Sequence, residues 1–344
     1  MLYGIAAATT ALLLAAVLTA LLRVPALRLG VVERRRQRQR PVPLLGGLAV
    51  VLATCAVAVA MDRTGVAPLG AGVGRLLVAG GAVAALGLVA DVGRVKARVL
   101  VAGTAVAAAS VVPYEETGVP AGLLAVGWIV FVAIGFKALD HADALAGTVG
   151  VLTAFGVGAC AAAELMDGLA VLLSVLAAAL TGFLMHNWPP ARMGLGACGS
   201  LFTGFLLAAS AVFTRAGYAL APSAGVLFSL TALASADVLL VVLSRRLAGR
   251  PLLRGGPDHV AHRLRRLGLT PQGATVLPGI GAFAGVFVGV LMHIGWTALS
   301  GVYWVGAVAL VVVLMLLRVP VYGLRRSVPT QSTQVSGPLR VRNG

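Results

Sequence analysis

Long runs of apolar residues, separated by short polar segments, decide what this chain can fold into. Of its 344 residues, 59% are hydrophobic and only 11% are charged, whereas a soluble domain carries about 25% charged residues. A helix that crosses the hydrocarbon core of a bilayer needs about 20 apolar residues. The runs are continuous rather than alternating, so they indicate helices and not a membrane β-barrel. We therefore predict an all-α integral membrane protein with about eleven transmembrane helices. The expected spans are centred on residues 3–22, 44–61, 74–90, 98–113, 121–138, 145–163, 168–186, 199–214, 223–244, 274–295 and 297–318.

The Lys and Arg residues are distributed unequally between the two sets of loops. With the N-terminus placed outside, 24 of the 27 Lys and Arg residues fall inside, and only Arg63, Arg75 and Arg215 fall outside. Because basic residues gather on the cytoplasmic side, we predict an N-out, C-in topology. The net charge of +16 is then explained by topology and by contact with anionic lipid. It gives no reason to expect nucleic-acid binding.

The apolar spans form one expected domain, residues 1–326, without an internal repeat. The remaining segment, residues 327–344, is rich in Ser, Thr, Gln, Pro and Gly. Such a composition buries too little apolar surface to fold by itself. We expect a disordered cytoplasmic tail there.

Five polar motifs interrupt the apolar pattern, and the expected topology places all of them on the cytoplasmic side. They are RPVPLLGG (40–47), GLVAD (87–91), KALDHADALAG (137–147), FLMHNWPPARMGLGACGSLFTG (183–204) and DHVAHRL (258–264). In this order they resemble the motifs of the polyprenyl-phosphate N-acetylhexosamine-1-phosphate transferases. That family includes the pentapeptide transferase of peptidoglycan synthesis and the GlcNAc-1-phosphate transferases of cell-envelope glycan synthesis. The resemblance covers about residues 1–320. Each short motif is weak evidence alone, but five motifs in the order of the family make the resemblance specific.

The resemblance implies a reaction at the cytoplasmic face of a bacterial plasma membrane. A polyprenyl phosphate would attack the β-phosphate of a UDP-sugar and release UMP, with Mg²⁺ as the cofactor. This location suits the chemistry, since a metal and cationic groups must neutralise the phosphate oxygens. The implied partners are polyprenyl phosphate, UDP-sugar and anionic lipid, and a homodimer or a partner enzyme remains open.

The motifs also supply the candidate site residues. The candidate catalytic carboxylates are Asp91, Asp140 and Asp143. Asp140 and Asp143 are the candidate metal pair, since one helical turn between them would place both on one helix face. Lys137 either supplies positive charge toward phosphate or pairs with Asp140. The candidate substrate-binding residues are Lys137, Asn187, Ser200, His259, His262 and Arg263.

Two further polar residues have simpler expected roles. Asp237 lies within an apolar span, where a carboxylate belongs either to a functional site or to an internal pair. His141 has no counterpart in the motifs, and we expect a local polar contact for it.

Several positions depart from the motifs of the family. Ala90, Ala146 and Ala197 stand where acidic residues are expected, and Ala261 stands where a histidine is expected. An alanine offers neither charge nor oxygen to a metal ion, so the usual electrostatic contribution to catalysis is lost at these positions. Two functions therefore stay open. The chain is either a transferase with a rearranged metal site or a catalytically degenerate relative that binds lipid phosphate or a partner protein.

Overall fold

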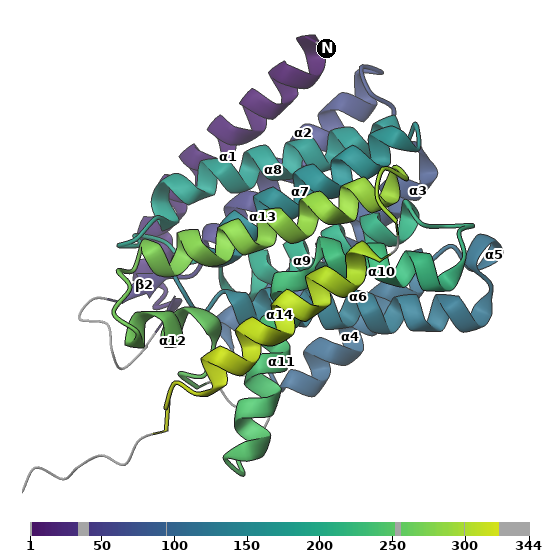
Figure 1. Cartoon of the computed structure of the whole chain (residues 1–344). Helices are drawn as coiled ribbons and strands as arrows, with labels where there is room; N and C mark the ends of the chain where they lie inside the picture. The colour runs from purple at the N-terminus through teal and green to yellow at the C-terminus, as the bar shows by residue number, and fades with distance from the viewer. Residues whose placement is uncertain (1, 34–40, 94, 252–255, 299, 323–344) are drawn as a thin grey trace, which may run out of the picture.

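The helices predicted from the apolar runs are present, and they form one bundle (Figure 1). The computed structural model describes residues 2–33, 41–93, 95–251, 256–298 and 300–322. The first half contains α1 (Leu2–Arg28), β1 (Val32–Glu33), β2 (Val42–Pro43), α2 (Gly46–Arg63), α3 (Gly70–Val92), α4 (Ala97–Val111), α5 (Tyr114–Thr117), α6 (Val119–Leu139) and α7 (Leu145–Ala163). The second half contains α8 (Asp167–Asn187), α9 (Gly196–Phe213), α10 (Leu220–Leu230), α11 (Ala232–Leu247), α12 (Val260–Arg266), α13 (Gly273–His293) and α14 (Gly301–Leu317). The expected tail after Arg326 lies outside the described residues.

Eight of the described helices are long and apolar enough to cross a membrane. The number of candidate spans rises to nine if one bent pair of helices is counted as a single span. The bent pair is α10 and α11, which meet at an angle of 82° within the apolar run predicted for 223–244. The runs predicted for 98–113 and 297–318 form the shorter apolar helices α4 and α14, of 15 and 17 residues. The all-α class is confirmed for the described residues, apart from the two-residue antiparallel strands β1 and β2.

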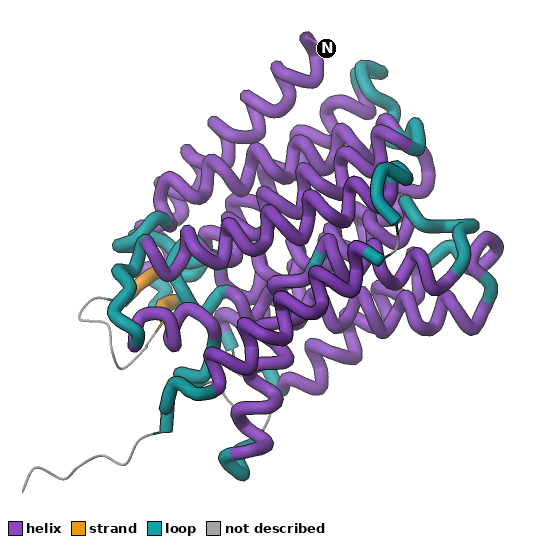
Figure 2. The backbone as a smooth tube through the Cα atoms, in the orientation of Figure 1, coloured by secondary structure: helices purple, strands orange, loops and turns teal. Residues whose placement is uncertain are grey.

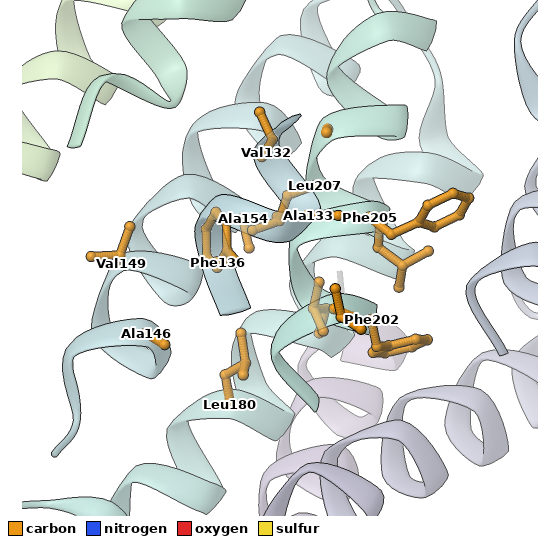
Figure 3. Close-up of a cluster of buried hydrophobic side chains, with 14 of the residues drawn as sticks. Val132, Ala133, Phe136, Ala146, Val149, Ala154, Leu180, Phe202, Phe205 and Leu207 are labelled. Carbon is orange, nitrogen blue, oxygen red and sulfur yellow. The ribbon is translucent and has the colours of Figure 1, made fainter. Parts of the chain in front are cut away.

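Helix α9 forms the centre of the bundle, where it packs against α2, α3, α6 and α7. Its residues from Gly196 to Val212 are all buried. Figure 3 shows part of this core, to which Phe202 and Phe205 of α9, Phe136 of α6 and Leu180 of α8 contribute. Because α9 is enclosed by other helices, the polar groups at its first turn need partners within the protein.

Loops gather at the two ends of the bundle (Figure 2). One end carries β1, β2 and α12, together with the turn between α6 and α7 and the loop between α8 and α9. The five sequence motifs meet at this end. The fold therefore brings together segments that are more than 100 residues apart in the sequence.

Two glycines allow α2 and α9 to cross with their backbones in contact. A Cβ atom on Gly47 would collide with the backbone of Gly199 and the carbonyl of Leu195, and a Cβ atom on Gly199 would collide with the Cα of Gly47. Small residues permit such close approach between membrane helices. Gly47 and Gly199 therefore allow α2 and α9 to approach each other closely.

This crossing makes a stability prediction. We expect Gly47→Ala to destabilise the purified protein by about 1–3 kcal/mol, because an added methyl group overpacks the contact. Gly81→Ala in α3 is the control, since nothing lies within 4 Å of a Cβ atom at that position. Thermal unfolding in detergent should show a lower midpoint for Gly47→Ala alone. Equal midpoints for the two variants would contradict the packing described here.

Candidate active site

An open cleft of about 1060 Å³ lies at the end of the bundle where the sequence motifs meet. It is bounded by the end of α1, by β2, by the turn between α6 and α7, by the loop between α8 and α9, and by α12 and the start of α13. Its charged side chains are Arg23, Arg192, Arg265, Arg266 and Asp143. Four guanidinium groups and one carboxylate give the cleft an excess of positive charge, which attracts anionic ligands.

Three of these arginines are exposed and available to a ligand. Among the described residues, Arg23, Arg192 and Arg265 make no side-chain hydrogen bond or ion pair. Arg266 differs, because it donates hydrogen bonds to the carbonyl oxygens of Pro320 and Val321. Guanidinium groups bind phosphate through paired hydrogen bonds. In the sequence these three arginines count only as basic residues of the inside loops. The sequence does not show that they lie together in one cleft.

Asp91 and Asp140 hold the first turn of α9. The two carboxylate oxygens of Asp91 accept hydrogen bonds from the amides of Ala197 and Cys198 at 2.8 and 2.9 Å. The Oδ2 atom of Asp140 accepts one from the amide of Gly196 at 2.9 Å. These amides lack partners within the helix, and the positive end of the helix dipole favours negative charge there. Two of the three candidate catalytic carboxylates, Asp91 and Asp140, therefore cap the central helix.

The expectation that Asp140 and Asp143 share a helix face is wrong. Helix α6 ends at Leu139 and α7 begins at Leu145, so both aspartates lie in the intervening turn. The turn is closed by Ala144, which has a left-handed backbone with φ of 61°. Oδ2 of Asp143 instead accepts a hydrogen bond from the amide of Ala191 at 3.1 Å. Asp143 also lines the cleft.

Asn187 joins the turn between α6 and α7 to the loop that follows α8. Its Oδ1 atom accepts a hydrogen bond from the amide of Ala144 at 2.8 Å, and its Nδ2 atom donates one to the carbonyl of Met193 at 2.6 Å. The side chain is buried. Asn187 thus positions two of the segments that form the cleft wall.

Ser200 and Arg263 are buried away from the lining of the cleft. Ser200 donates a hydrogen bond to the carbonyl of Gly196 within α9. Arg263 donates to the carbonyl oxygens of Leu316 and Val319 at 2.7 Å each, and so satisfies the C-terminal end of α14. Lys137 is exposed in the last turn of α6.

Next to Arg263, the carboxylate of Asp258 is held by two other side chains. Burial raises the pKa of Asp258, but hydrogen bonds from Arg245 and Tyr322 outweigh burial and leave that pKa below its usual value. When Asp258 is charged, these hydrogen bonds hold it in place just before α12.

Three imidazoles and one buried carboxylate lie beside the cleft. The rings of His141 and His259 are stacked with centroids 4.3 Å apart, and the ring of His262 lies 5.1 Å from that of His141. Nδ1 of His259 lies 2.8 Å from Oδ2 of Asp237, so the internal pair expected for Asp237 is confirmed. Burial, and then the neighbouring His259, lower the pKa of His141 well below its usual value. His141 therefore belongs to a cluster that its sequence context did not reveal.

Mg²⁺, which the resemblance implies, has a limited set of ligands here. Both oxygens of Asp91, one of Asp140 and one of Asp143 accept amide hydrogen bonds, and Ala197 has no oxygen in its side chain. Asp143 is the carboxylate that lines the cleft. One or two carboxylates can hold Mg²⁺ when substrate phosphates supply further ligands. The residues present therefore fit a site in which Asp143 and the substrate phosphates together hold Mg²⁺. They do not fit a site in which protein side chains supply all the ligands.

The capping role of Asp91 can be tested without a substrate. We expect Asp91→Asn to lower the unfolding free energy by about 1.5–3 kcal/mol, because hydrogen bonds to a charged group are lost or weakened. Glu116→Gln is the control, since Glu116 is exposed on α5. Thermal unfolding in detergent should separate the two variants. An unchanged midpoint for Asp91→Asn would show that the carboxylate does not stabilise α9.

Comparison with known proteins agrees with the motif resemblance. The family described as Glycosyl transferase family 4 matches residues 74–215. A Streptomyces coelicolor protein named "Putative glycosyltransferase SCO3672" is 65% identical over 329 residues, which cover 94% of this chain and 80% of the relative. The decaprenyl-phosphate N-acetylglucosaminephosphotransferase of Mycolicibacterium smegmatis is 28% identical over 90% of this chain and 86% of its own length. The phospho-N-acetylmuramoyl-pentapeptide-transferase of Moorella thermoacetica is 34% identical over 45% of this chain and 46% of its own length. The chain therefore belongs to glycosyl transferase family 4, among relatives of the polyprenyl-phosphate N-acetylhexosamine-1-phosphate transferases.

Proposed function

We propose that this chain transfers a phospho-N-acetylhexosamine from a UDP-sugar to a polyprenyl phosphate during cell-envelope glycan synthesis. The observation that carries the proposal is the open cleft in which four arginines face one carboxylate. Both substrates of this reaction are phosphate anions. The names of the relatives support the same class of reaction, because they include N-acetylglucosaminephosphotransferases that act on decaprenyl phosphate.

In this proposal the arginines bind the phosphate groups of the two substrates. Arg23, Arg192 and Arg265 come from α1, the loop after α8 and α12, so three separate elements contribute guanidinium groups to the lining of the cleft. Guanidinium groups bind phosphate oxygens in pairs and keep their charge at all physiological pH values. The cleft volume of about 1060 Å³ is slightly above the range of about 300–1,000 Å³ found for small-molecule sites. It has room for a nucleotide sugar beside a lipid headgroup.

The remaining candidate residues divide between contact and positioning. His262 lines the cleft, and Lys137 adds a further positive charge on α6, so both are proposed to contact substrate. His259, Asn187, Ser200 and Arg263 are proposed to position the cleft walls.

We propose that Mg²⁺ is held by Asp143, with Asp140 of the same turn as its second carboxylate. When bound, Mg²⁺ would neutralise negative charge on the phosphate oxygens. The turn between α6 and α7 holds both side chains, and Asn187 fixes that turn through the amide of Ala144.

A second candidate function is supported by a separate observation. Ala90, Ala146 and Ala197 supply no acid, and both oxygens of Asp91 are bonded to the amides of α9. A chain with these features suits the binding of a lipid phosphate or a partner enzyme without turnover. The arginines of the cleft serve either function, so binding and turnover have to be measured separately.

Turnover is tested by the release of UMP from UDP-GlcNAc with purified protein, undecaprenyl phosphate and Mg²⁺. We expect UMP release, and we expect Arg192→Gln and Arg265→Gln each to lower kcat/KM about ten- to a hundredfold, since a charged hydrogen bond contributes about 1.5–3 kcal/mol. Arg246→Gln is the matched control, because Arg246 is exposed on α11 and does not line the cleft.

This assay, combined with equilibrium binding of UDP-GlcNAc and of undecaprenyl phosphate to the same protein, separates the two candidate functions. Binding of both ligands without UMP release would select the non-catalytic function. Absence of both binding and turnover would contradict the transferase and a lipid-phosphate-binding protein alike, and would leave only the binding of a partner enzyme. An equal effect of Arg246→Gln would show that the general charge of this end of the protein, and not the cleft, accounts for the loss.

We further propose that the chain crosses the plasma membrane eleven times, with the N-terminus outside and the cleft in the cytoplasm. The eight long helices, the bent pair of α10 and α11, and the shorter helices α4 and α14 would be the spans. The unequal distribution of Lys and Arg supports this orientation. Residues 1–326 are proposed to form one transferase domain.

The topology is tested by labelling single cysteines in a variant without the three native ones. We expect an impermeant maleimide added to intact cells to label Glu116→Cys, which lies in the α4–α6 connection. It should label Leu267→Cys, which follows α12, only after the membrane is permeabilised. Labelling of Leu267→Cys in intact cells would contradict the orientation.

A further inference from the structure

His141, Asp237 and His259 form a buried group of possible metal ligands at the inner wall of the cleft. They come from three separate elements: the turn between α6 and α7, helix α11, and the start of α12. One ligand atom from each lies within 4.8 Å of the other two. Buried charged groups are costly unless they are paired or coordinate a metal. The function proposed above does not require this group to bind a metal.

The hydrogen bonds of the group fix which ring nitrogen of His141 can bind a metal. Nδ1 of His141 lies 2.8 Å from the carbonyl oxygen of Ala138. A carbonyl only accepts hydrogen bonds, so Nδ1 carries the hydrogen and Nε2 carries the lone pair in the neutral ring. Metal-binding histidines are generally oriented by such a bond from their other nitrogen.

Asp237 is also held by hydrogen bonds. Its Oδ1 atom accepts a hydrogen bond from the amide of Val260 at 2.8 Å, and its Oδ2 atom lies 2.8 Å from Nδ1 of His259. A divalent cation at this position would replace the proton that Asp237 and His259 share. The carboxylate would keep its bond to Val260, so one of its two oxygens stays fixed while the other turns to the metal.

We propose that His141, Asp237 and His259 bind a divalent transition metal of the Zn²⁺ class. Two imidazoles and one carboxylate suit Zn²⁺, whereas Mg²⁺ prefers oxygen ligands and retains water. His141 lines the cleft, which supplies both an entry path and an open coordination position. Three protein ligands with one open position are typical of catalytic rather than structural zinc sites.

Binding requires a local adjustment of the side chains. Zinc–ligand bonds of about 2.0–2.2 Å draw the ligand atoms closer together than they are here. The rings of His141 and His259 are stacked, with 18° between their planes, so one ring must turn for the two nitrogens to converge. The bond from Nδ1 to Ala138 orients His141, so His259, whose hydrogen bond to Asp237 the metal would replace, is the ring that turns.

The site is tested with the metal alone. Full-length protein, purified through a tag without histidine and treated with a chelator, is mixed with Zn²⁺ and passed through gel filtration before elemental analysis. We expect about one Zn²⁺ per chain, the stoichiometry of a site with three protein ligands. Co²⁺ serves as a second probe, since its visible absorption reports a tetrahedral nitrogen and oxygen environment. Millimolar Mg²⁺ should not displace either ion.

Two variants locate the bound metal. His141→Asn keeps an amide donor at the position of Nδ1 for the carbonyl of Ala138 but removes Nε2, so it lowers Zn²⁺ affinity by more than the roughly 10–100-fold that loss of an outer partner costs. His186→Asn is the control, because His186 lies at the end of α8 outside the group. The proposal is overturned if the wild type retains no Zn²⁺, or if His141→Asn binds it as the wild type does. UMP release plays no part in these measurements, so they stand whether or not the chain is a transferase.

Discussion

The first turn of α9 is the point on which the rest of the structure depends. This helix is enclosed on all sides by α2, α3, α6 and α7, so water cannot satisfy its first amides. The carboxylates of Asp91 and Asp140 do so instead, from the end of α3 and from the turn after α6. Each bond joins segments that are far apart in the chain. The contact of α2 and α9 at Gly47 and Gly199 completes the arrangement, because it lets the Pro43–Gly46 segment pack against Gly194.

This use of carboxylates shapes the chemistry that the cleft can perform. With Asp91 and Asp140 bonded to α9, and with alanine at positions 90, 146 and 197, Asp143 is the acid that faces the ligand space. Positive charge comes from arginines on three different elements. In the proposed function, phosphate binding therefore depends more on guanidinium groups, and less on carboxylate-bound Mg²⁺, than the motifs suggest. The imidazole of His141 lines the cleft and stacks on that of His259, where a nitrogen-rich site for a different metal is proposed.

The sequence predicted the helices well because the bilayer imposes a length and a polarity on each span. It also predicted which motifs meet at one end. It did not predict the 82° bend between α10 and α11, since neither Pro nor Gly marks the break at Thr231. Residue type alone likewise could not show that Arg263 satisfies the end of α14 or that Ser200 bonds within α9. These roles depend on which backbone group each side chain meets after packing, and local sequence patterns do not contain that information.

Hydrogen–deuterium exchange at the start of α9 tests the central role of these carboxylates most directly. Amides 196–198 are expected to exchange slowly in the wild type, because Asp91 and Asp140 accept their hydrogens. In Asp91→Asn the amides of Ala197 and Cys198 should exchange faster, while the rest of α9 keeps its protection. Equal exchange at these amides in both proteins would contradict the account, because α9 would then be held by something other than these bonds.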